Sequence, residues 1–254
     1  MMEKLIAQLN RLYLMPGPAL PAELGEHFRG VRAVPVPLAS GDDLTRAIVI
    51  DFPRERDALG HWTALCAVAN TLQETFGFPA PAVSITGDSG YRLWLSLAEP
   101  VPVGDARRFL SMLREHYWPE RELELRDAVE LPPCLNGASG KWAAFIHPGM
   151  GASFGEEAGL EMAPPMAAQV AFIEGLESIG RAQFFDALVS MKQADTAAPA
   201  QPELPARPAA DAPPPAPAAT EGLLLKDATL EDIVRHLHAL NIEPTFRHLL
   251  PGRN

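Results

Sequence analysis

The chain has 254 residues, of which 47% are hydrophobic, and a formal net charge of −11. This length suits one large domain or two small ones, and the acidic balance argues against a whole-surface attraction to nucleic acid or to anionic membranes. The two cysteines, Cys66 and Cys134, form no C-x-x-C pair, which argues against a thiolate zinc site. We expect two buried free thiols, with one disulfide as the alternative.

The N-terminal residues predict an amphipathic helix over 2–13, because Leu5, Leu9 and Leu12 fall on one face together with neighbouring apolar residues. This stretch lacks the continuous apolar segment of a secretory signal. The sequence contains no run of about 18 or more apolar residues, so we expect no transmembrane helix and no membrane partner. The expectation is a soluble, cytoplasmic protein.

Predicted strands and helices alternate along the chain up to about residue 192. In order, they are a weak strand at 31–37, a buried strand at 46–52, a helix at 57–76, a hairpin of strands at 82–86 and 91–97, a helix at 104–117, strands at 127–131 and 142–147, and helices within 166–192. The central β-α-β-β-α-β order is the split βαβ pattern of ferredoxin-like and RNA-recognition-motif-like folds. We therefore predict an α+β domain over residues 1–192, with helices on one sheet face and the other face open to a ligand.

The composition changes after this domain. Residues 193–222 are almost entirely Ala, Pro and small polar residues, which predicts a disordered linker. Residues 223–254 form a C-terminal segment, and residues 229–241 within it predict a short amphipathic helix. A helix of this length is marginal alone, so we expect it to dock on its own domain or on a partner.

Three stretches carry the functional information: "AIVIDFPRERD", "SITGDSGYRLWLSL" and "AVELPPCLNGASGKWAAFIHP". In this order they resemble the archaeo-eukaryotic primase superfamily, the primase-polymerases, and among its members the primases of plasmids and bacterial conflict systems. In that family an apolar strand ends in Asp-x-Asp, and a hairpin of the form Ser-Gly-x-x-Gly-x-His follows. A Leu-Pro strand and a loop ending in Gly-Lys come later, as Leu131, Pro132, Gly140 and Lys141 do here.

The resemblance implies a set of site residues. Family members transfer nucleotides with two divalent ions, magnesium or manganese, which are held by carboxylates. By resemblance, Asp51 is a catalytic residue and a metal ligand, and Glu115 is the third acid, with Glu122, Glu124 and Asp127 as alternatives. The nucleotide- or phosphate-binding residues would be Thr86, Gly87, Ser89, Gly90, Arg92 and Lys141.

The sequence departs from the family at two decisive positions. Pro53 replaces the second acid, and Arg92 stands in place of the histidine. Arginine can still hold a phosphate, whereas the loss of a metal-binding carboxylate should cost orders of magnitude in rate. We therefore expect a primase-like protein that binds single-stranded DNA or a nucleotide, in replication or defence of a bacterial mobile element, with weak or lost nucleotidyl transfer.

Other interpretations remain. Asp51 can simply end a strand before a turn, and Lys141 can be a solvated side chain. The domain can be a non-catalytic adaptor whose helix 229–241 recruits a replication or defence protein through a groove. It can also be an active primase in which Glu55 or Asp57 supplies the missing acid. A basic strip beside Arg92 and Lys141 would favour nucleic acid.

Overall fold

The computed structural model describes residues 1–17, 21–54, 59–88 and 90–197. The predicted C-terminal helix 229–241, most of the predicted linker 193–222, and the acids Glu55 and Asp57 lie outside the described residues. The last described helix, α6 (Arg181–Ala197), runs five residues past the predicted domain end at 192. The stretch from 193 to 197 contains no proline, so nothing in it breaks the helix.

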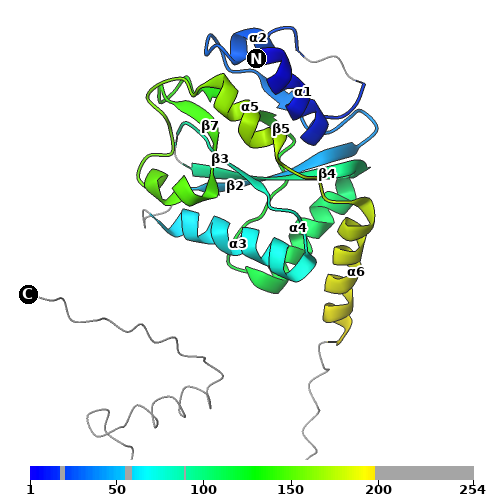
Figure 1. Cartoon of the computed structure of the whole chain (residues 1–254). Coiled ribbons are helices and arrows are strands. Elements are labelled where there is room, and N and C mark those ends of the chain that lie inside the picture. The colour runs from blue at the N-terminus through cyan, green and yellow to red at the C-terminus, as the bar shows by residue number, and fades with distance from the viewer. Residues whose placement is uncertain (18–20, 55–58, 89, 198–254) are drawn as a thin grey trace, which may run out of the picture. The chain divides into compact units, whose positions relative to one another are not determined.

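The centre of the described fold is a five-stranded antiparallel sheet (Figure 1). Its strands lie in the order β2 (Leu44–Pro53), β4 (Gly90–Pro102), β3 (Ala82–Ile85), β7 (Trp142–Ile146) and β6 (Cys134–Leu135). A separate two-stranded sheet joins β1 (Pro35–Pro37) to β5 (Ala128–Glu130). The domain is therefore mixed α+β, and the strands predicted at 46–52, 82–86, 91–97 and 142–147 are present.

The expected fourth strand of the split βαβ pattern is placed differently. In the RNA-recognition-motif-like layout, residues 127–131 would lie beside β2 in the main sheet. Instead β5 pairs with β1, while β7 and β6 extend the sheet beyond β3. Burial explains the difference, because Val129 and Leu131 pack over one face of the main sheet and not along its edge. The sheet thus shares with that layout only the order β2-β4-β3, and the layout itself is not confirmed.

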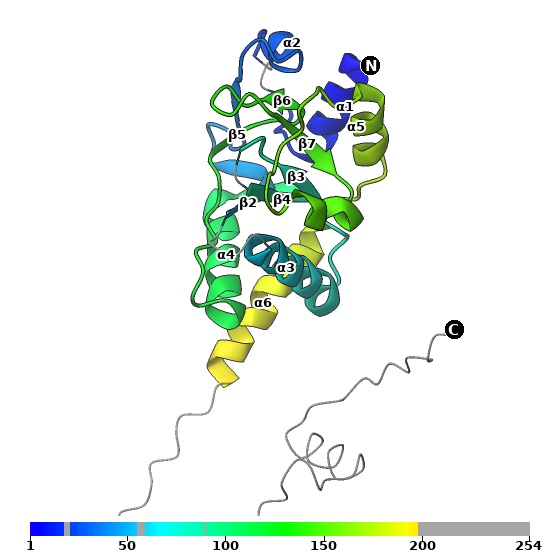
Figure 2. The ribbon, with the colours of Figure 1, turned by 90° about the vertical axis from the view of Figure 1, so that its left-hand side faces the viewer.

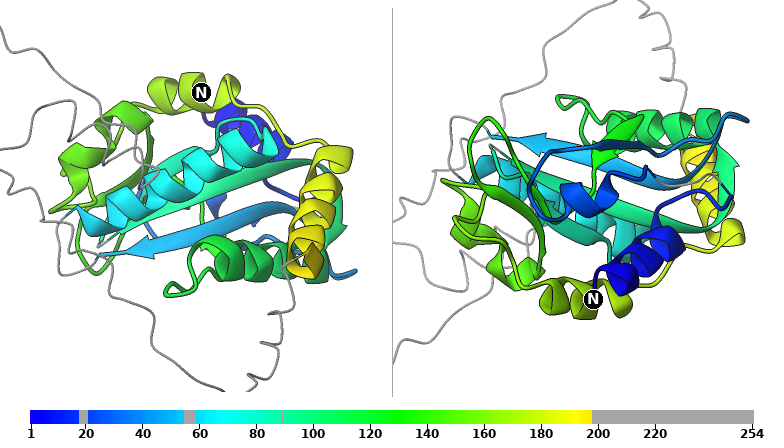
Figure 3. Two further views of the ribbon diagram at one scale, coloured as in Figure 1. Left: turned by 90° about the horizontal axis from the view of Figure 1, so that it is seen from below. Right: turned by 90° about the horizontal axis from the view of Figure 1, so that it is seen from above.

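Helices cover both faces of the main sheet, contrary to the expected open face (Figures 1 and 2). One face carries α3 (Gly60–Phe76), α4 (Val103–Tyr117) and α6, and the other carries α1 (Met2–Leu12), α5 (Met166–Glu174), the β1–β5 pair and the nearby short α2 (Leu24–His27). Figure 3 shows α3 lying along the sheet on one side and α1 on the other. The cause lies in β2, whose Ile48 and Ile50 enter one core while Ala47 and Val49 enter the other.

The helices predicted at 2–13, 57–76 and 104–117 correspond to α1, α3 and α4. The predicted helical region 166–192 is divided into α5 and α6, with Gly175 at the break. Helix α3 ends at Gly77, whose φ of 64° is the left-handed conformation that glycine adopts without strain. None of the described helices is both long enough and apolar enough to cross a membrane.

Gln169 on α5 completes the hydrogen bonding of β7. Its buried side-chain Oε1 accepts a bond of 2.8 Å from the Phe145 N–H, and its Nε2 donates a bond of 3.0 Å to the Phe145 carbonyl. The amide therefore acts as a short substitute for a neighbouring strand. Without it, two buried backbone groups would lose their partners.

We expect Gln169→Ala to lower the free energy of unfolding by about 2–4 kcal/mol, since each orphaned buried group costs about 1–3 kcal/mol. Urea unfolding followed by circular dichroism measures the change. Gln183→Ala is the matched control, because that side chain donates to the Gly77 carbonyl at the surface. Equal losses in the two variants would contradict this role of Gln169.

Candidate functional site

The two motif residues Asp51 and Arg92 lie opposite each other on neighbouring strands. They are register partners on β2 and β4, so their side chains project from the same face of the sheet. This is the face that carries Val49 and Trp94 further along the strands. At the Asp51 end the face opens into a cavity of about 360 Å³, whose polar walls include Thr86, Asp88, Arg126, Glu130 and Asn136.

A chain of ion pairs fills one side of this cavity, which we call the strand-end pocket. Asp51 Oδ1 accepts a hydrogen bond of 2.8 Å from Arg92 Nε, and Asp51 Oδ2 lies 3.3 Å from Arg126 Nη1. Arg92 Nη1 in turn lies 3.5 Å from Glu130 Oε2. Positive and negative side chains therefore alternate in the order Arg126, Asp51, Arg92, Glu130, and both oxygens of Asp51 have arginine partners.

Arg92 is the most enclosed member of this network, with only 13% of its side chain exposed, against 43% for Arg126. An enclosed guanidinium interacts more strongly with a nearby anion than a solvated one does. The lining includes three carboxylates, Asp51, Asp88 and Glu130, and the two arginines, so its formal charge is −1. The basic strip that would favour a nucleic acid strand is thus absent from the walls of this pocket.

Sequence reasoning missed Arg126 and Glu130. Both belong to the segment leading into and through β5, about 75 residues or more after Asp51, and only the long-range pairing of β5 brings them to the pocket. One signal was available for Glu130, which stands between the buried Val129 and Leu131. A charged residue between two buried residues of a strand projects to the opposite side.

The hairpin between β3 and β4 is held by its own hydrogen bonds. Thr86 Oγ1 accepts bonds from the N–H groups of Asp88 (3.3 Å) and Gly90 (3.2 Å), and the Gly87 N–H donates to the Ala158 carbonyl at 2.8 Å. The amides of Gly87 and Gly90 therefore have partners within the protein. Although Thr86 and Gly90 line the pocket, the two glycine amides are not directed at a ligand. Ser89 lies outside the described residues.

Gly87 has a structural requirement of its own. Its φ is +75°, and a Cβ placed on it would lie 2.8 Å from the Lys141 carbonyl oxygen and 2.9 Å from the Ala143 nitrogen. Any other residue would meet both backbone strain and a clash. The glycine thus allows the hairpin to pack closely against the start of β7.

Lys141 does not join the other motif residues in the pocket. Its ammonium group pairs with Glu157 and, at 3.3 Å, with Glu161, and only 17% of the side chain is exposed. It is therefore not the solvated lysine considered from the sequence. A phosphate would have to displace two carboxylates to reach it.

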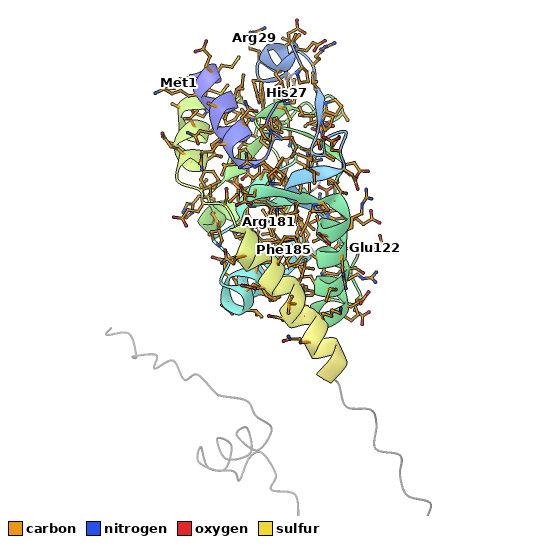
Figure 4. All side chains as sticks on the ribbon, turned by 90° about the vertical axis from the view of Figure 1, so that its right-hand side faces the viewer. Met1, His27, Arg29, Glu122, Arg181 and Phe185 are labelled. Atoms are coloured by element: carbon orange, nitrogen blue, oxygen red, sulfur yellow. The ribbon has the colours of Figure 1, made fainter. Side chains whose placement is uncertain are left out.

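The candidate third acids are dispersed. Glu115 lies on α4, where it accepts a bond from Ser111 Oγ, and the exposed Asp127 pairs with Arg107 at 3.0 Å. Glu124 lies in a second groove beside α4. Glu122, at the surface beside α4 (Figure 4), shares a further hollow with Asp51 and Glu120. Within the described part of the chain, no three His, Cys, Asp or Glu side chains are grouped so that they could hold a metal ion.

The residues present at Asp51 do not fit the family's two-metal arrangement. Hard cations need several oxygen ligands, and Asp51 offers oxygens that two guanidinium groups already contact. Pro53 has no ligating side chain, and Glu130 is paired with Arg92. We derive no metal-dependent step from this arrangement.

Both cysteines are free thiols, as expected, but only Cys134 is buried, whereas Cys66 is partly exposed. Cys134 lies in the wall of the strand-end pocket and is 4% exposed. Burial is the main cause that raises the pKa of its thiol to about 12, with a further contribution from the carboxylate of Glu130. The thiol is therefore protonated at neutral pH and is a poor nucleophile.

Comparisons with known proteins give a structural likeness and no sequence relative. No protein-family model matches the chain, and no curated protein matches its sequence. Among solved structures, the AEP domain of the cyanophage S-2L primase-polymerase (PrimPol) is similar, with 14% sequence identity and a TM-score of 0.38. The match covers 59% of this chain and 96% of that one.

Proposed function

We propose that this chain is a primase-like protein that binds a nucleotide, or the phosphate-bearing end of single-stranded DNA, in the strand-end pocket without transferring nucleotides. The observation that carries the proposal is the Asp51–Arg92 pair. In the motif resemblance these two residues stand in place of the family's first acid and its triphosphate-binding histidine. They face one cavity and are in direct contact. A role in replication or defence of a bacterial mobile element belongs to the same proposal.

The charges favour a small ligand or a strand end over a long strand. A strand that is bound along its backbone without sequence preference depends mainly on Lys and Arg side chains near several of its phosphates. Here Arg92 and Arg126 are the arginines of the pocket, and Lys141 is neutralised by two glutamates. Such a site can bind one or two phosphate groups but not the backbone of a long nucleic acid strand.

The same geometry supports the loss of nucleotidyl transfer. The reaction needs two divalent ions that bridge the triphosphate and the attacking oxygen. Asp51 is paired with arginines, and Pro53 occupies the position of the second acid. The alternative in which Glu55 or Asp57 completes the site concerns residues outside the described part of the chain.

A binding assay on the full chain tests the proposal. We expect a deoxynucleoside triphosphate or a labelled short single strand to bind in buffer with Mg²⁺ or in buffer with EDTA. Arg92→Ala should weaken binding by about 10- to 100-fold, the usual range for one charge-assisted hydrogen bond to phosphate. Arg181→Ala is the control, because that side chain lies over Phe185 on α6 (Figure 4) and outside the pocket.

A primer-synthesis assay with the same protein should give no product. Product that depends on Asp51 would show that the active-primase alternative is right. Absence of binding in both buffers would overturn the proposal. The adaptor hypothesis would then be favoured, with residues 229–241 as the segment to use as bait for a protein partner.

A further inference from the structure

Each of the two carboxylate oxygens of Asp51 faces an arginine. Oδ1 accepts a bond of 2.8 Å from Arg92, and Oδ2 lies 3.3 Å from Arg126. In a metal-dependent site these oxygens would face the cations. Here each oxygen faces a guanidinium group. The positive charge beside Asp51 is therefore supplied by arginine side chains and not by metal ions.

Both arginines retain hydrogen-bond capacity toward the pocket. A guanidinium group has five N–H donors. Arg92 uses Nε for Asp51 and Nη1 for a long contact of 3.5 Å with Glu130, and its Nη2 makes no hydrogen bond to the described residues. Arg126 contacts Asp51 through Nη1 alone and is 43% exposed. Two guanidinium groups with donors to spare, on either side of one carboxylate, match the geometry that binds phosphate oxygens.

We propose that the strand-end pocket binds the phosphate group as a metal-free anion between Arg92 and Arg126, with Asp51 as the positioning residue for Arg92 and as the competing anion on Arg126. This inference rests on the proposed function and specifies the form of its ligand. Asp51 keeps its short bond to the enclosed Arg92, and the phosphate takes its place on the exposed Arg126. The shorter, more enclosed contact is the one that stays.

A metal ion should therefore hinder binding. Magnesium in excess coordinates the phosphate oxygens of a triphosphate, which are the oxygens that the arginines need. Metal-dependent binding, as in the primase family, predicts that Mg²⁺ strengthens binding, because carboxylates repel a triphosphate that carries no metal. The sign of the metal effect separates the two modes.

The first experiment is a calorimetric titration of the full chain with dATP and with inorganic triphosphate. We expect both probes to bind in EDTA, and excess Mg²⁺ to weaken binding about threefold or more. Inorganic triphosphate distinguishes recognition of the phosphate from recognition of the nucleoside. Binding of dATP that requires Mg²⁺ or Mn²⁺ would overturn the inference and leave the proposed function standing, whereas no binding in either buffer would overturn both.

Two substitutions test the roles of the individual residues. Arg126→Ala should weaken binding in EDTA about tenfold or more, because a charge-assisted contact is lost. Asp51→Asn should strengthen it by about three- to tenfold, because the competing charge is gone while the amide oxygen can still accept from Arg92. A metal ligand would behave in the opposite way, since Asp51→Asn would abolish binding.

Glu99→Gln is the matched control for Asp51→Asn. It removes the charge from another carboxylate–arginine pair, with Arg181, outside the pocket. Its affinity for inorganic triphosphate should equal that of the unmodified chain. Thermal melting of all variants shows whether each is folded. A folded Asp51→Asn variant with reduced affinity in EDTA would overturn the competition with Arg126.

Discussion

Replacing Trp94 by alanine should lower the free energy of unfolding by about 3–5 kcal/mol, the usual loss for a buried aromatic residue. Trp94 is 1% exposed and lies on β4 at the centre of the main sheet. Its ring centroid is 5.2 Å from that of Tyr13 and 5.5 Å from that of Phe145, and its Nε1 donates a bond of 2.8 Å to Ser84 Oγ. The substitution removes all of these contacts and leaves a large cavity.

Because a domain of this size is stable by only about 5–15 kcal/mol, the variant should lose a large fraction of its stability. Chemical denaturation followed by far-ultraviolet circular dichroism measures the loss. Trp118→Ala is the control, because Trp118 is only partly buried against the other core cluster and should cost less. A Trp94→Ala loss no greater than that of Trp118→Ala would contradict the central role of this aromatic cluster.

The local elements of the fold could be predicted from the sequence because their signals are local. The apolar run Ala47–Ile50 indicates a buried strand, and the glycines at 87 and 90 indicate a tight turn between two strands. The same apolar run also indicates that both faces of the strand are buried. Four consecutive buried residues, without polar alternation, are typical of a strand covered on both faces. The expectation of an open sheet face therefore disagrees with this pattern.

The pairing of charges in the site could not be predicted in the same way. The motif resemblance draws attention to Arg92, but Arg126 and Glu130 reach it only through the pairing of β5 with β1. The neutralisation of Lys141 likewise depends on Glu157 and Glu161, in a loop packed against the hairpin. These contacts depend on tertiary packing. Sequence patterns that span only a few residues carry no information about it.

Introducing the residues of the primase motif should create a metal site only when the arginine is removed as well. Pro53→Asp places a second carboxylate on the same face of β2 as Asp51, two residues away. We expect the single variant Pro53→Asp to bind no Mn²⁺, because Arg92 and Arg126 still contact both oxygens of Asp51. Adding Arg92→His frees Oδ1, and we expect the double variant to bind Mn²⁺ at least about tenfold more tightly than Pro53→Asp alone.

Electron paramagnetic resonance of free Mn²⁺ during a titration measures this binding directly, without an activity assay. Pro53→Asn with Arg92→His is the matched control, because it frees Oδ1 but adds no second carboxylate. Circular dichroism verifies that the variants fold, since the change at 53 lies at the exposed end of an edge strand. Tight Mn²⁺ binding by Pro53→Asp alone would contradict the blocking role of the arginines. The proline at position 53, and not the arginines beside Asp51, would then be what prevents metal binding.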